Sequence, residues 1–161
     1  MNSTRHNFCS LRSRSAERGQ STVEFALMAL FIFLLIVGFI EMVLFLHTYN
    51  VLADSAKEGI RYAIVHGADN TSASGPTCPC SAIDGAPGTG VVKTYAQYSL
   101  HDTTNMTVTV DYNPNSANGT KACNKALCLV RVTVIYLYQP FFGLGWPTVT
   151  VNAAADGRIV Y

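Results

Sequence analysis

One stretch of the chain, residues 18–67, decides the fold. It reads RGQSTVEFALMALFIFLLIVGFIEMVLFLHTYNVLADSAKEGIRYAIVHG. Within it, residues 25–46 carry one charged side chain, that of Glu41. As a helix these residues would span about 33 Å, which exceeds the roughly 30 Å hydrocarbon core of a bilayer. A secretory signal peptide has a shorter apolar core followed by a small-residue cleavage site. The segment therefore predicts a membrane helix that is retained.

The helical pattern continues beyond the apolar run. Leu52, Ala56 and Ile60 recur at helical spacing, with charged side chains between them. Gly67 is a suitable C-terminal stop. We therefore expect one helix from about residue 21 to 66, apolar all round in its first half and amphipathic in its second. Such a helix anchors the chain and forms one wall of an external domain.

The rest of the chain predicts a small α+β domain. Residues 67–90 are rich in Gly, Ser, Ala, Thr and Pro and are expected to form a loop. A short helix is expected within residues 91–100. Its predicted inner face consists of Val92, Tyr95, Ala96 and Ser99.

Three later segments switch to a period of two, which is typical of strands. They are residues 105–112, 129–138 and 148–161, and each alternates apolar and polar side chains. Their connections are long enough for antiparallel neighbours. We expect the amphipathic half of the long helix to pack on this small antiparallel sheet of about three strands.

The distribution of charge predicts an orientation in the membrane. Residues 1–19 carry four arginines against one glutamate, a net charge of +3. Residues 20–161 carry seven Lys and Arg against nine Asp and Glu, a net charge of −2. Positive flanks favour the cytoplasmic side, so we expect the N-terminus inside and the remainder outside. No basic patch indicates nucleic acid as a partner.

Cysteine placement agrees with this orientation. Four of the five cysteines fall on the expected outer side, where disulfides persist. Because Cys78 and Cys80 are too close to bridge each other easily, we expect each to pair with Cys123 or Cys128. A four-cysteine zinc site is the alternative, but CPC and CNKALC are not the usual paired CxxC spacing. Disulfides are therefore preferred, and no metal is predicted.

Two segments resemble chemical sites without meeting their requirements. GAPGTGVVKT (residues 85–94) suggests a phosphate-binding loop, but two valines separate Gly90 from Lys93, and no apolar strand precedes it. His101 beside Asp102 suggests a hydrolase, but the chain has no GxSxG turn. We therefore expect no catalytic residues, no cofactor and no small-molecule substrate.

An aromatic segment, QPFFGLGWP (residues 139–147), lies between two predicted strands. It is either an exposed tip that binds a surface or a neighbouring subunit, or a loop that folds its rings onto the sheet. We expect the second, because large aromatic side chains are mostly buried.

The carboxylate of Glu24, directly before the apolar run, can be explained as part of a helix cap. Ser21-Thr22-Val23-Glu24 fits a capping box, with Ser21 as the cap of the helix and Glu24 returning the hydrogen bond. The helix dipole also favours a carboxylate there. Capping does not account for the arginine and glycine immediately before it.

These residues resemble a known family. Gly19, four residues, Glu24-Phe25 and a membrane helix resemble the cleavage region of type IV-like prepilins. RGQSTVEFAL, Glu41 and the later LADSAKEGIRYAIVHG (residues 52–67) resemble the TadE-like proteins of the tight-adherence (Tad) pilus system. Lys57 and Ile60 stand where that family often has Arg and Ala. The motif residues after the membrane helix are Ala56, Glu58, Gly59, Arg61 and Tyr62.

The resemblance implies a pilin-like fold and a minor pilin or pseudopilin, not an enzyme. A prepilin peptidase would cut after Gly19, leaving Gln20 as the new N-terminus. The implied domains are a basic leader (1–19), a long helix (20–66) with the membrane segment (25–46), and an extracytoplasmic domain (67–161). The implied partners are the peptidase, other pilins, TadE- and TadF-like subunits, the inner-membrane assembly platform and membrane lipid.

Cleavage would give Glu24 a new partner. It creates an ammonium at Gln20, and an unpaired charge in a bilayer is costly. Glu24 lies four residues further on, one helical turn, and can neutralise this amine or that of a neighbouring subunit. Glu41 lies about 25 Å further along the helix axis, where it could sit among headgroups or pair with a partner helix.

The resulting prediction is a single-pass inner-membrane protein that enters or primes a Tad-type pilus for surface attachment. The alternative is an uncleaved, signal-anchored extracytoplasmic binding domain unrelated to pili. An anchored periplasmic enzyme is the third class, and it would need a convergent polar pocket.

Overall fold

The chain divides into two compact units, residues 1–42 and residues 43–161. Cys78, Cys80, His101 and Trp146 lie outside the residues described, as do residues 1–12 of the leader. The computed structural model describes residues 13–75, 81–100, 102–114, 123–143, 145 and 147–160.

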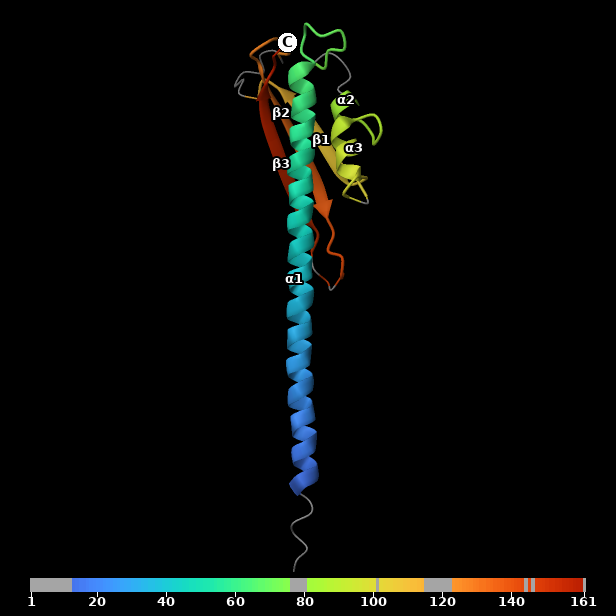
Figure 1. Cartoon of the computed structure of the whole chain (residues 1–161), viewed down its shortest axis with the longest axis vertical. Coiled ribbons are helices and arrows are strands. Elements are labelled where there is room, and N and C mark those ends of the chain that lie inside the picture. Colours follow the sequence, from blue (N-terminus) through green and yellow to red (C-terminus); the bar gives the residue numbers. More distant parts are fainter. Residues whose placement is uncertain are drawn as a thin grey trace, which may run out of the picture. The chain divides into compact units, whose positions relative to one another are not determined.

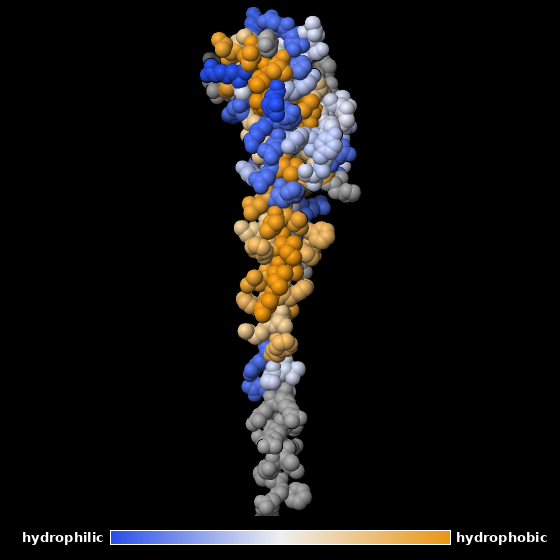
Figure 2. All heavy atoms as spheres, viewed as in Figure 1, coloured by the Kyte–Doolittle hydropathy of each residue, from blue (hydrophilic) through white to orange (hydrophobic). Residues whose placement is uncertain are grey.

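A single long helix, α1 (Ser13–Val65), contains the apolar run (Figure 1). It ends one residue before the expected position and begins eight residues earlier than expected. In the first unit its apolar side chains are exposed, with Phe25 at 74% and Phe39 at 64%, and most of its visible face is apolar (Figure 2). By length and composition this helix is able to cross a membrane.

The second unit contains a three-stranded antiparallel sheet in the order β1-β2-β3, as predicted. The register between the first two strands pairs Val110 with Val132, and that between the last two pairs Val134 with Ala153. Alternating β-branched residues favour this pleated arrangement because one face is buried and the other is solvated. The strands are β1 (Met106–Tyr112), β2 (Leu129–Tyr138) and β3 (Val149–Arg158).

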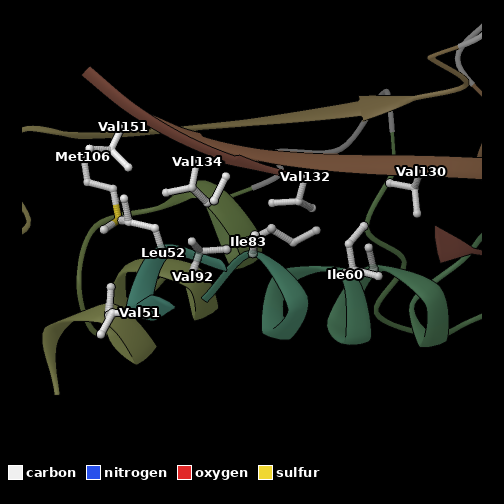
Figure 3. Packing of buried hydrophobic residues seen from close by; sticks show 14 of the residues in the cluster. Val51, Leu52, Ile60, Ile83, Val92, Met106, Val130, Val132, Val134 and Val151 are labelled. Carbon is white, nitrogen blue, oxygen red and sulfur yellow. The ribbon is translucent and has the colours of Figure 1, made fainter. Parts of the chain in front are cut away.

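Residues 43–65 of α1 pack on one face of this sheet together with two short helices. The core lies between the helices and the sheet, and Leu52, Ala56, Val132 and Val134 are fully buried in it (Figure 3). Burying a leucine or valine side chain contributes about 1.5–3 kcal/mol, so this layer accounts for much of the stability of the unit. The α+β fold class is confirmed.

One of the short helices was predicted and the other was not. α3 (Val91–Gln97) buries Val92 and Ala96 completely, as expected, whereas Tyr95 is 43% exposed and Ser99 follows the end of the helix. α2 (Ser81–Asp84) falls where a loop was expected, and its Ile83 is fully buried. The loop prediction is wrong for these four residues because one buried isoleucine fixes a helical turn.

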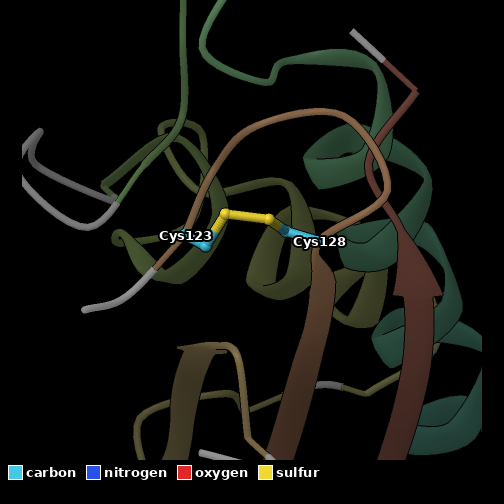
Figure 4. Close-up of a disulfide and its surroundings, with 2 residues drawn as sticks. All are labelled: Cys123 and Cys128. Atoms are coloured by element: carbon cyan, nitrogen blue, oxygen red, sulfur yellow. A yellow bond between two sulfur atoms is a disulfide. The ribbon is translucent and has the colours of Figure 1, made fainter. Parts of the chain in front are cut away.

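A disulfide joins Cys123 to Cys128, so the prediction that each pairs with Cys78 or Cys80 is wrong (Figure 4). The two Cα atoms are 5.9 Å apart, within the usual range for a disulfide. A tight turn brings them together, with Leu127 at a φ of 71° and its N–H bonded to the carbonyl of Ile159.

We expect peptide mapping to recover this pairing. Trypsin cuts after Lys121, Lys125 and Arg131, so non-reducing digestion should release residues 122–125 linked to residues 126–131. Reduction should separate the two peptides. A bridge from either peptide to the one containing Cys78 and Cys80 would contradict the structure. Closing so short a loop stabilises the fold by about 2 kcal/mol in the chain-entropy model.

The aromatic connection between β2 and β3 does not fold onto the sheet. Phe141 is 77% exposed and Phe142 is 40% exposed, and the two rings contact each other edge to face at 5.2 Å. The prediction of a buried loop is wrong for these two rings, because the connection extends past the last paired residues, Tyr138 and Val149.

Candidate processing and assembly site

The predicted processing site lies on α1 in the first unit. Gly19 and Gln20 are both helical and exposed. Among the described residues, and apart from its chain neighbours and its own helix backbone, no atom lies within 4 Å of the position that a Cβ on Gly19 would take. The Gln20 side-chain amide donates a hydrogen bond to Glu24 Oε1 at 3.0 Å. One helical turn therefore already brings the side chain of residue 20 to the carboxylate, as the i,i+4 spacing dictates.

The capping-box interpretation of Glu24 is wrong in the intact chain. Because α1 begins at Ser13, Ser21 lies inside the helix and cannot act as its N-cap. Glu24 instead accepts a hydrogen bond from Gln20. The interaction that sequence reasoning missed was this side-chain pair, and the spacing of four residues was the signal for it.

Two other predicted site residues of the first unit, Phe25 of the cleavage region and the assembly residue Glu41, differ in exposure. Phe25 is 74% exposed, as a side chain facing lipid or another subunit would be. Glu41 is 4% exposed, whereas Met42 beside it is 59% exposed. The Glu41 side chain is therefore buried within the described chain, and its pairing with headgroups or a partner helix stays a prediction.

The motif after the apolar run has an inward half that lets α1 approach its neighbours closely. Ala56 is fully buried, and a Cβ added to Gly59 would lie 2.6 Å from Val92 Cγ2 and 3.3 Å from Val132 Cγ1. Gly59 is thus where α1, α3 and β2 converge. Packing at this position therefore requires a small residue.

Gly59→Ala is expected to destabilise the second unit. Overpacking costs about 1–3 kcal/mol, and the better helix propensity of alanine recovers about 1 kcal/mol. The measurement is amide hydrogen exchange of β2 in the full chain in detergent. Val92→Ala is the matched partner: the double variant should be more stable than additivity predicts, by about 1 kcal/mol. Additive effects would show that the two side chains do not meet.

The outward half of the motif carries charge and an aromatic ring. Arg61 and Glu58 form an ion pair at 3.3 Å, with side chains 77% and 37% exposed. Tyr62 stacks on His66 with ring centroids 3.8 Å apart, and His66 Nδ1 lies 2.8 Å from the Tyr62 carbonyl oxygen. Tyr62 also packs in part against the hydrophobic core, whereas the Arg61 side chain is mostly exposed. A surface hollow of about 400 Å³ beside them is lined by Glu58, Arg61, Tyr62, Ile64, Val65 and Val91.

Two further ion pairs lie on the surface of the second unit. Arg131 donates to both carboxylate oxygens of Asp156 at 2.6 and 2.7 Å, and this hydrogen bonding lowers the pKa of the Asp156 carboxyl. A hydrogen bond to Asp54 raises the pKa of Lys57 in the same way. Exposed pairs of this kind contribute little to stability.

The predicted cleavage region, the apolar run and the motif all lie on α1. Residues 19–61 match the family model described as TadE-like protein. The resemblance to the TadE-like family is therefore confirmed over this segment. No curated protein and no solved structure matches the chain. The TadE-like match ends at Arg61, so the sheet, the disulfide and the aromatic connection lie outside it.

Proposed function

We propose that this chain is a minor pilin or pseudopilin of a Tad-type pilus, and that it is a substrate and structural subunit, not an enzyme. The TadE-like match indicates association with a Tad pilus in general. The observation that carries the finer proposal is the Gln20–Glu24 pair, one residue after the glycine at which a prepilin peptidase would cut. Cleavage places an ammonium on the residue whose side chain Glu24 already binds.

The proposed pathway follows from charge and packing. The N-terminus begins in the cytoplasm, the apolar run spans the inner membrane and the second unit faces outward. Removal of the basic leader by the peptidase leaves one positive charge at the membrane edge, which Glu24 neutralises. The mature helix then packs among other pilins, including TadE- and TadF-like subunits, at the assembly platform.

The proposal is tested by deleting the chain in the cell that encodes it. Surface pili and attachment to a solid surface should both fall, and re-expression of the full chain should restore them. Re-expression of a chain that starts at Gln20 should not, because it lacks the basic leader that sets orientation. Normal pili and normal attachment after deletion would contradict the proposed role.

A further inference from the structure

The β2–β3 connection, an apolar part of the second unit, lies close to the C-terminal end of the apolar run. The Tyr138 ring at the end of β2 contacts the Phe45 ring of α1 edge to face, with centroids 5.4 Å apart. Phe45 is among the last residues of the run. The connection that follows Tyr138 carries the exposed rings of Phe141 and Phe142.

The direction of β2 along α1 places this connection at the membrane end of the unit. Val132 lies beside Gly59, and Tyr138 lies beside Phe45. Fourteen helical residues span about 21 Å and six strand residues about 20 Å, so β2 runs alongside α1 in the opposite direction. Figure 1 shows the β2–β3 connection at the end of the sheet away from the C-terminus.

The composition of the hairpin fits a membrane surface. No Asp, Glu, Lys, Arg or His occurs between Arg131 and Asp156, so insertion of its tip desolvates no charge. Val149 and Tyr49 are 43% and 45% exposed at the same end of the unit. Exposed aromatic and apolar side chains gather at membrane interfaces, where their rings lie at the level of the headgroups.

We propose that the β2–β3 tip, residues 139–143, inserts Phe141 and Phe142 into the outer headgroup–acyl boundary of the bilayer that α1 spans. The occupant is lipid, because the tip adjoins the end of an apolar run long enough to cross a bilayer and carries no charge. The inference rests on the membrane anchoring in the proposed function. The inserted tip would be a second membrane contact, which holds the second unit against the membrane before assembly.

The test uses the full chain with Trp146→Phe, reconstituted in phosphatidylcholine liposomes with lipid brominated at upper acyl carbons. Trp146 is the sole tryptophan, so each further variant carries one reporter. Phe141→Trp places the reporter on the tip and Phe33→Trp places it within the run. Val160→Trp is the matched control, because Val160 is 59% exposed and its N–H binds the carbonyl of Ile64 at the opposite end of the unit.

The tip reporter should lose most of its emission in brominated liposomes, as should the reporter at position 33, while the reporter at position 160 stays bright. Quenching at 33 without quenching at 141 would overturn the inference and leave the anchor intact. A reporter at 141 that responds only to added pilin subunits would overturn it in favour of a protein partner. Absence of quenching at 33 would overturn the anchor, and with it the inference.

Discussion

Gly19→Val is expected to abolish processing and leave the full-length chain in the membrane. Beyond its chain neighbours and its own helix backbone, no atom of the described residues lies within 4 Å of a Cβ at this position, so a Cβ there does not clash with the rest of the described chain. The loss would therefore arise in the peptidase, whose site would have to select glycine. Intact mass of the chain co-expressed with a prepilin peptidase measures the effect, and a shortened mass would contradict it.

Gly19→Ala separates two contributions to that loss. Alanine adds one methyl group and also strengthens the helix by about 1 kcal/mol, which opposes local unwinding of α1 at the cleaved bond. We expect it to be processed less than the native chain. Gly38→Ala is the matched control, because Gly38 is also helical with no atom within 4 Å of the added carbon, yet lies away from the bond. Reduced processing of this control would show that helix strengthening at any position is sufficient.

Glu24→Ala is expected to be processed normally and to assemble poorly. The Gln20 ammonium would then lack its partner, and removing one member of an ion pair that is buried among packed subunits costs about 3–5 kcal/mol. That cost corresponds to a loss of at least roughly 100-fold in the equilibrium between free and assembled chain. Intact mass measures processing, and the amount of chain in sheared surface filaments measures assembly.

Glu24→Gln and Glu24→Asp test whether charge is the cause. The glutamine variant keeps an oxygen able to accept the hydrogen bond from the Gln20 side chain, which is 3.0 Å long in the native chain, but removes the charge. The aspartate variant keeps the charge on a shorter side chain. Assembly should fail with glutamine and recover in part with aspartate. Normal assembly of the glutamine variant would leave Glu24 with a hydrogen-bonding role alone.

The regular elements could be predicted because their periodicity is strong. The alternation of valines predicted β2 and its buried face. The 3.6-residue pattern that stops at Gly67 predicted the C-terminal end of α1. The start of α1 could not be predicted in the same way. Ser21 and Glu24 fit a cap in isolation, but the preceding residues continue the helix to Ser13 and override that local signal.

The irregular features depended on contacts between distant residues, and these were harder to predict. The side-chain bond between Gln20 and Glu24 was missed, although the spacing of four residues indicates it. The close packing at Gly59 could be seen only once Val92 and Val132 were placed beside it. Phe141 is 77% exposed, against the usual burial of aromatic rings on which the sequence-based expectation rested.

The most direct test of the central claim is the N-terminus of the mature chain in cells that make a Tad-type prepilin peptidase. The account predicts a chain that begins at Gln20 and lacks residues 1–19, and a full-length chain when the peptidase is inactive. A chain that keeps its leader in the presence of active peptidase, or that begins at a residue other than Gln20, would contradict it.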